Sequence, residues 1–109
     1  MVDLNKIKNI YLYGSPISLS FGIPSLTNII ETSYTKEEIQ NSLFVFFGKS
    51  KSQIKIIEID DTGVWLYQKR LTNSNFQLPS FDQGLVIDKQ QLLIILNNIK
   101  SKKVRNNAK

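Results

Sequence analysis

The stretch LFVFFGKSKSQIKIIEIDDTGVWLYQKRL, residues 43–71, predicts three consecutive β-strands joined by two short turns. Its first run, residues 43–47, is apolar at every position and lies between a serine and a glycine, which is typical of a strand covered on both faces. Residues 53–60 and 64–71 are rich in β-branched and aromatic residues, as strands usually are. The polar GKSKS segment between the first two runs predicts a hairpin loop. We therefore expect an antiparallel sheet at the centre of the fold.

The second turn, DTG at residues 61–63, fits a three-residue hairpin loop with Gly63 in the left-handed region, where a Cβ would be costly. This loop fixes the register of the two flanking strands and opposes Lys55 to Lys69. A shift of one residue would move the apolar set to the other face. The face that we expect to point into the core consists of Ile57, Ile59, Trp65, Tyr67 and Leu71.

Three acidic residues lie at or just before this turn and allow two interpretations: Glu58, Asp60 and Asp61. They could begin a metal site of an enzyme that acts on phosphates, or they could form the acidic end of a turn. A hard cation needs several oxygen ligands that converge on one point, and the chain contains no histidine to add to the set. Short acidic side chains bond readily to nearby backbone amides, so the turn is favoured.

Other catalytic signals are weak, and we predict that the protein is not an enzyme and holds no metal or cofactor. GKS at residues 48–50 is similar to the end of a phosphate-binding loop, but the glycine required earlier falls at Leu43 and a strand follows. Without histidine or cysteine the chain cannot form a Ser-His or Cys-His nucleophile. A Ser-Lys pair stays open, although no spacing points to one.

The flanking sequence predicts a short strand over residues 10–13 and a helix over 22–34, with a further helical turn begun by a capping box at Thr35 and Glu38. FQLP, at residues 76–79, suggests a short edge strand ended by its proline. A final helix begins after Asp88, with a buried stripe formed by Leu92, Ile95, Leu96 and Ile99. The expected fold is α+β: an antiparallel meander of four to five strands packed with a helix from the N-terminal half and a C-terminal helix.

Charge is distributed unevenly along the 109 residues, whose formal net charge is +5. Five of the 14 basic residues lie in residues 100–109, and the other nine are balanced by the nine acidic residues. We expect one domain over residues 1–99 and a basic, flexible tail that either contacts phosphate or only maintains solubility. The chain has no cysteine, no apolar run long enough to span a membrane and an N-terminus too polar for a signal peptide, so a cytoplasmic location is expected.

The order of these segments resembles the TnpB accessory proteins of the insertion-sequence-sixty-six group of bacterial transposons. The similarity extends from about Ile10 to Ile99 and includes IYLYGSP, GIPSL, LFVFFGKSK, DDTG, LYQKRL, F-x-L-P and QQLLIILNNI. These are the products of the element's second reading frame, not the RNA-guided nucleases that share the abbreviation. The resemblance implies a small accessory factor for transposition that acts beside a larger transposase, through contacts with double-stranded DNA or with the transposase.

The resemblance also suggests which residues contact nucleic acid. The basic loop of the family corresponds to Lys49, Lys51 and Lys55, and its Lys-Arg pair corresponds to Lys69 and Arg70. The tail would add further phosphate contacts from Lys100, Lys102, Lys103 and Arg105.

Two departures from the family pattern raise a second hypothesis. SLSFG, at residues 18–22, replaces a segment that usually reads Asp-Met-Arg-Lys-Gly, and Phe47 stands where arginine is common. A DNA surface would be weaker without these charges. The alternative is a protein–protein interaction module without direct DNA contact, whose candidate contact residues are Phe21, Phe47 and Phe81. A hydrolase that uses Glu58 and Asp60 is the third hypothesis and ranks last.

Overall fold

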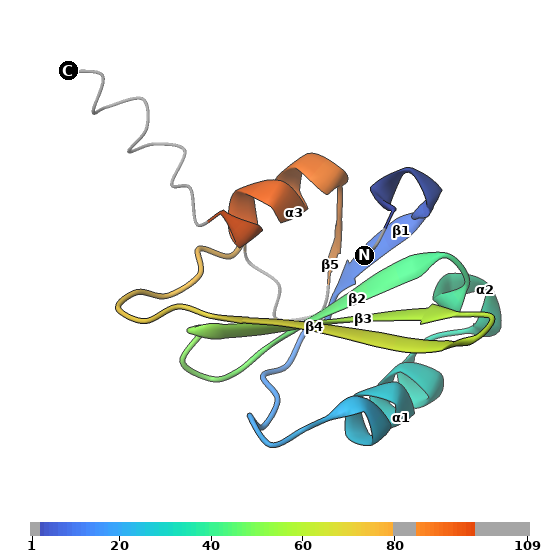
Figure 1. Cartoon of the computed structure of the whole chain (residues 1–109), viewed down its shortest axis with the longest axis horizontal. Coiled ribbons are helices and arrows are strands. Elements are labelled where there is room, and N and C mark those ends of the chain that lie inside the picture. Colours follow the sequence, from blue (N-terminus) through green and yellow to red (C-terminus); the bar gives the residue numbers. More distant parts are fainter. Residues whose placement is uncertain (1–2, 80–84, 98–109) are drawn as a thin grey trace.

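The computed structural model describes residues 3–79 and 85–97 (Figure 1). One five-stranded sheet, in the order β4-β3-β2-β1-β5, forms the centre of the molecule. The α+β class, with one helix from the N-terminal half and one near the C-terminus, is confirmed. In chain order the elements are η1 (Leu4–Lys6), β1 (Asn9–Leu12), α1 (Ile23–Ser33), α2 (Lys36–Ile39), β2 (Ser42–Phe47), β3 (Gln53–Asp60), β4 (Gly63–Arg70), β5 (Leu85–Ile87) and α3 (Lys89–Leu96).

One strand pair departs from the expected antiparallel meander. β1 and β2 are parallel, with Asn9 opposite Ser42 and Leu12 opposite Val45, whereas the other three pairs are antiparallel. The chain between β1 and β2 crosses one face of the sheet through α1 and α2, and such a crossover returns the next strand in the same direction.

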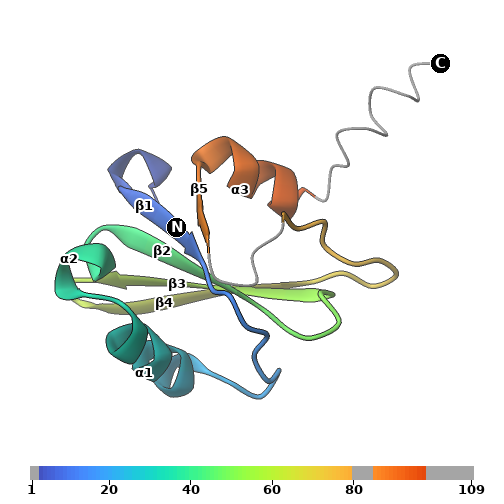
Figure 2. The ribbon, with the colours of Figure 1, turned by 180° about the vertical axis from the view of Figure 1, so that it is seen from behind.

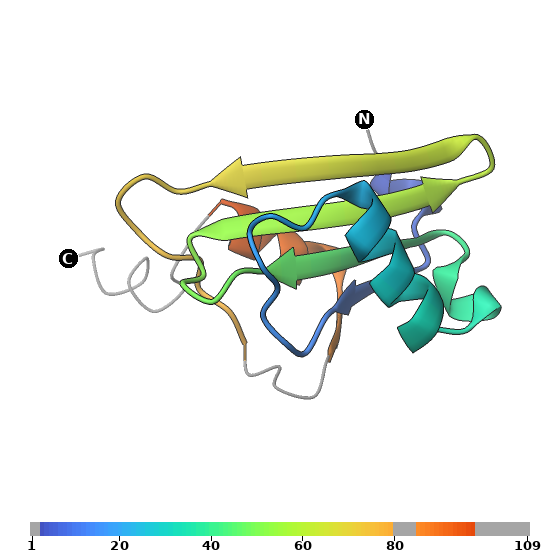
Figure 3. The ribbon, with the colours of Figure 1, turned by 90° about the horizontal axis from the view of Figure 1, so that it is seen from below.

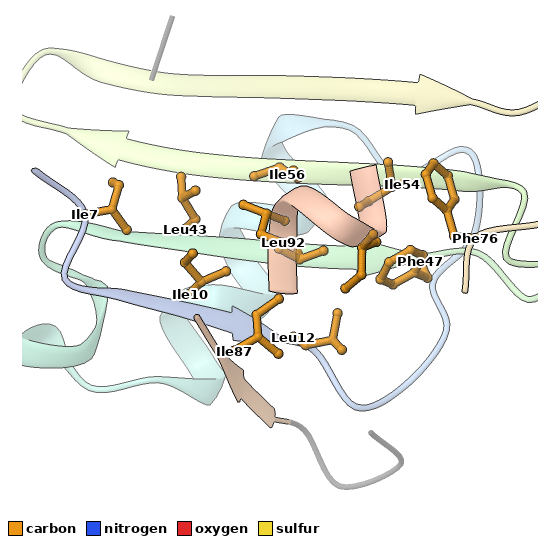
Figure 4. Close-up of a cluster of buried hydrophobic side chains, with 12 residues drawn as sticks. Ile7, Ile10, Leu12, Leu43, Phe47, Ile54, Ile56, Phe76, Ile87 and Leu92 are labelled. Carbon is orange, nitrogen blue, oxygen red and sulfur yellow. The ribbon is translucent and has the colours of Figure 1, made fainter. Parts of the chain in front are cut away.

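The helices cover opposite faces of the sheet, with α1 on one side and α3 on the other (Figures 1 and 2). This creates two apolar clusters, the α3-side core and the α1-side core. The buried members of the α3-side core are Ile7, Ile10, Leu12, Leu43, Val45, Phe47, Ile54, Ile56, Phe76, Ile87, Leu92 and Ile95 (Figure 4). Those of the α1-side core are Ile17, Leu26, Ile30, Phe44, Phe46 and Ile57.

Strand β2 contributes to both cores. Leu43, Val45 and Phe47 belong to the α3-side core, and the alternate residues Phe44 and Phe46 belong to the α1-side core. All six residues of the strand are buried, which confirms the prediction that this run is covered on both faces.

Both predicted capping boxes are present. The backbone N–H of Thr35 donates to Glu38 Oε1 at 2.8 Å, and the N–H of Glu38 donates back to the threonine hydroxyl at 3.2 Å. At the start of α3, the N–H of Gln91 donates to Asp88 Oδ1 at 2.7 Å, and the glutamine amide oxygen accepts from the N–H of Asp88 at 2.8 Å. These local bonds satisfy amides that a helix leaves unpaired at its start.

The predicted β3–β4 register is wrong by one residue. The loop contains two residues, not three, so that Asp60 lies opposite Gly63 and Glu58 lies opposite Trp65. Gly63 belongs to β4 and has no left-handed backbone conformation. Tyr67 packs against the α3-side core, whereas the side chain of Trp65 is 51% exposed instead of buried.

The edges of the sheet also differ from the sequence-based expectation. Residues 76–79 form no strand, although Phe76 is buried in the α3-side core and its backbone N–H donates to Lys51 O at 2.7 Å. The strand beyond β1 is instead β5, which has only three residues and pairs Val86 with Tyr11. A run this short gives almost no periodic signal in the sequence.

Candidate nucleic-acid interface

Four basic side chains lie at one end of the sheet, which we call the basic end: Lys49, Lys51, Lys69 and Arg70. The two lysines of the β2–β3 loop are exposed, and Arg70 lies opposite Gln53, the first residue of β3. The hairpin connection therefore brings the loop and the end of β4 together, although about 20 residues of sequence separate them.

Backbone hydrogen bonds hold the β2–β3 loop in place. The N–H of Lys51 donates to Gly48 O at 3.1 Å, and Lys51 adopts a φ of 60° to close the turn. The N–H of Leu71 donates to Ser52 O at 2.8 Å, which ties the loop to the chain as it leaves β4. The basic residues are thus presented on a fixed turn.

Lys69 connects the basic end to α3. Its ammonium donates to the carbonyl oxygen of Leu96 at 2.8 Å, at the C-terminal end of the helix, where carbonyl groups carry partial negative charge. Arg70 makes a longer contact, from Nη2 to Gln53 Oε1 at 3.5 Å. Because α3 ends beside Lys69, the chain enters its last segment from this end of the sheet. The predicted contacts Lys100, Lys102, Lys103 and Arg105 lie outside the described residues.

The opposite end of the sheet carries both acidic and basic residues, with Lys8 just before β1 and Lys36 at the start of α2. It includes Asp60 and Asp61 at the β3–β4 turn, and Glu37 and Glu38 of α2, the helix that leads into β2. The first residues of β2 lie beside the last residues of β3, with Leu43 opposite Glu58, so these groups share one end. Strands β3 and β4 therefore run between an acidic turn and the basic end.

Asp60 is the residue that closes the β3–β4 turn. Its Oδ1 accepts hydrogen bonds from Thr62 N at 2.8 Å, Thr62 Oγ1 at 2.9 Å and Gly63 N at 2.9 Å. Bonds from Thr62, above all the one from its backbone N–H, hold the pKa of the Asp60 carboxyl below 3.8. Glu58 accepts instead from the Tyr67 hydroxyl at 3.2 Å. The interpretation of Asp60 as a turn residue is confirmed, and within residues 3–79 and 85–97 no three acidic, histidine or cysteine side chains are grouped to hold a metal ion.

This pKa gives a test by pH. A folded-state pKa lowered from 3.8 contributes stability that is present above pH 3.8 and is lost as the pH falls through the folded value. Asp60→Asn retains an oxygen acceptor but does not titrate, so the variant should lose less stability than the parent on acidification from pH 5 to pH 2. Urea unfolding at a series of pH values measures the difference. Asp61→Asn, the same change of charge at the next position, is the matched control, and an equal effect of the two substitutions would contradict the assignment.

Lys55 does not belong to the basic end. Its side chain is only 5% exposed, and its ammonium donates to the carbonyl oxygens of Leu19 at 2.8 Å and Phe21 at 2.6 Å. The side chain fixes the loop that carries SLSFG and is not available to a phosphate. The family correspondence implied that Lys55 contacts DNA. The structure instead places this lysine inside the protein, bonded to two backbone carbonyl groups.

The phenylalanines proposed as partner contacts are also located differently from the expectation. Phe47 is 1% exposed within the α3-side core, where its ring meets Phe76 with centroids 5.9 Å apart. Phe21 is half-buried and packs against the α1-side core. Phe81 lies outside the described residues. The large apolar side chains that do reach the described surface are Leu19, Ile23, Trp65, Val86 and Leu93.

Comparison with known proteins places these observations in a family. The family model described as IS66 Orf2 like protein matches residues 8–106. The chain is also 35% identical over 79 residues to a protein of Sinorhizobium fredii (strain NBRC 101917 / NGR234) designated uncharacterized protein y4hO, covering 72% of this chain and 69% of that one. No solved structure matches. Among the helices that the structure describes, none has the length and apolarity needed to cross a membrane.

The family match covers every described element except η1, and it agrees with the resemblance seen in the strand–turn–strand sequence. This chain belongs to the IS66 Orf2-like family, and that membership implies an accessory role associated with transposition.

Proposed function

We propose that this protein assists transposition by binding DNA phosphates through its basic end while it acts beside the transposase of the same element. The observation that carries the proposal is the presence of Lys49, Lys51, Lys69 and Arg70 at one end of the sheet, with Lys69 directed to the α3 side and Arg70 to the opposite face. The family is not a known catalytic family, which agrees with a binding role.

The charge distribution favours one orientation on DNA. Lysine and arginine contact phosphates without reading sequence, so the basic end supports attachment rather than site selection. Asp60 and Asp61 lie at the other end of the same strands and would be repelled by the duplex. The sheet is therefore expected to approach DNA with its basic end facing the phosphate backbone of the duplex. The turn that contains Asp60 and Asp61 would point away from the duplex.

A protein–protein module without DNA contact is the second candidate. Phe47 is buried and Phe21 is half-buried against the core, so these two side chains offer little apolar surface to a partner. Trp65 favours this candidate instead, because a half-exposed tryptophan is common at interfaces and costly to leave in water. The family membership suggests the transposase as one partner.

The DNA proposal is tested by the salt dependence of binding. Each lysine or arginine that contacts a phosphate adds about 0.9 to the slope of log affinity against log salt. The triple variant Lys49→Ala, Lys51→Ala, Arg70→Ala should therefore reduce the slope by about 2.7 and weaken binding to a fluorescent duplex at low salt, with little dependence on its sequence. Lys69 is retained in this variant because its ammonium also holds α3.

The matched control removes three exposed lysines outside the basic end: Lys6, Lys8 and Lys36. It loses the same total charge, so it separates a local contact from a general electrostatic effect. A chain shortened after Asn97 measures the contribution of the tail. Equal slopes for the two triple variants would contradict the proposed interface, and co-purification with the transposase without retention on DNA would favour the second candidate.

A further inference from the structure

We propose that the free edge of β4 pairs with β4 of a second copy of this chain, antiparallel and about a twofold axis at Leu66. The inference does not depend on the DNA-binding proposal. β4 is an eight-residue edge strand, whereas the strand at the other edge, β5, has three residues (Figure 3). In the described part of the chain only β3 pairs with β4, and a long unpaired edge is a template for another strand.

The backbone of β4 fixes which residues can pair outward. Directly opposed residues of an antiparallel pair alternate between hydrogen-bonded and non-hydrogen-bonded positions. The N–H of Leu71 bonds to Ser52 O, directly across the same register, so the odd-numbered residues of β4 bond to β3. The even-numbered residues therefore direct their N–H and C=O groups away from β3. Leu66 is the even-numbered residue nearest the middle of the strand.

A twofold axis at Leu66 gives the exposed tryptophan a partner. Antiparallel pairing of Leu66 with itself places Trp65 opposite the partner's Tyr67, and Tyr67 opposite the partner's Trp65. Within one copy these two rings already stack, with centroids 6.1 Å apart and planes 15° from parallel. Pairing would extend the stack to four rings on one face of a continuous sheet, and Trp65 would lose much of its 51% exposure.

Charge supports the same arrangement. β4 begins beside the acidic turn of Asp60 and Asp61 and ends at Lys69 and Arg70. An antiparallel partner brings each acidic turn next to the basic end of the other copy, whereas a parallel partner would bring like charges together. Lys49 and Lys51 are on the β2–β3 loop and not on this edge, so pairing leaves them available, whereas Arg70 lies on the edge and would be shared between the partner's acidic turn and DNA. This charge complementarity between the two ends of β4 favours a second copy of the chain as the partner of the free edge.

The test is the mass of the full chain in solution without DNA, by analytical ultracentrifugation over a range of concentrations at low salt. We expect a concentration-dependent dimer, with a blue shift in the emission of Trp65, the one tryptophan of the sequence. Leu66→Pro should abolish the dimer, because it removes an outward N–H and leaves the bonds to β3 in place. Circular dichroism establishes that the variant is folded.

Charge reversal keeps the test decisive if the proline variant does not fold. Arg70→Glu or Asp61→Lys alone should raise the dimer dissociation constant about tenfold, and the double variant should restore it. Lys89→Glu, on α3 and away from the edge, is the matched control. A chain that stays monomeric at every concentration would overturn the proposal, as would a dimer that neither Leu66→Pro nor Arg70→Glu weakens. The proposal also fails if a dimer forms without a change in Trp65 emission.

Discussion

Phe47→Ala is expected to lower the free energy of unfolding by about 3–5 kcal/mol, the usual range when a fully buried phenylalanine is removed from a core. Phe47 is 1% exposed at the end of β2, and its ring meets Phe76 edge-on, with 65° between the ring planes. Alanine would leave a cavity between the sheet and the segment that follows β4. Urea denaturation followed by circular dichroism measures the loss.

Phe21→Ala is the matched control for this prediction. Phe21 is half-buried at the margin of the α1-side core, so its truncation should cost only about 1 kcal/mol. Phe47 and Phe21 were both candidate partner contacts on sequence grounds, and the comparison separates a core residue from a marginal one. A cost for Phe47→Ala as small as that for Phe21→Ala would mean that Phe47 does not support the core in solution.

The elements that the sequence predicts well are those with short-range signals. The capping boxes at Thr35 and Asp88 need only residues three positions away, and both form. The apolar run of β2 indicates burial on two faces without any knowledge of its neighbours. Strand β5 and the parallel β1–β2 pair depend on contacts between distant segments, and the local pattern of residues does not specify them.

The register of β3 and β4 shows a different limit. Choosing a register from an apolar face works when only one face of the hairpin is buried. Here Ile56 belongs to the α3-side core and Ile57 to the α1-side core, so either register buries an isoleucine. The length of the β3–β4 loop therefore decides the register. That length depends on Asp60, whose carboxylate accepts hydrogen bonds from the amides of Thr62 and Gly63 and thereby closes a two-residue turn.

The candidate site could be predicted only in part, because some of its contacts are local and others join distant segments. Lys49 and Arg70 lie at the same end of the sheet because the β2–β3 loop precedes β3 and β4 returns antiparallel to β3, which the sequence indicates. Lys55 was expected on the surface because lysines usually are, yet it lies two residues before Ile57 and therefore on the same, buried face of β3. The two-residue spacing between Lys55 and Ile57 was the sequence signal that Lys55 is buried. What the sequence could not supply was the partner of the ammonium, two carbonyl groups more than 30 residues away.

Lys55→Ala is the second prediction with a large effect, and the expected loss in the free energy of unfolding is about 2–4 kcal/mol. The substitution removes two hydrogen bonds from a charged donor, to Leu19 O and Phe21 O, and also the packed methylene stem of the lysine. Lys49→Ala, an exposed lysine of the neighbouring loop, should change stability by less than about 0.5 kcal/mol. Urea unfolding of both variants measures the contrast, and equal values would show that burial of Lys55 contributes nothing.

Lys55→Met separates the two contributions, because methionine retains most of the stem but cannot donate a hydrogen bond. If the ammonium anchors the loop, this variant should lose about 1.5–3 kcal/mol. The backbone around Leu19 and Phe21 should then exchange amide hydrogens faster and be cleaved more readily by protease, while the centre of β2 stays protected. A methionine variant as stable as the parent, with an unchanged loop, would reduce Lys55 to a packing residue. Loss of stability together with local loosening would instead show that the Lys55 ammonium holds this loop against the sheet.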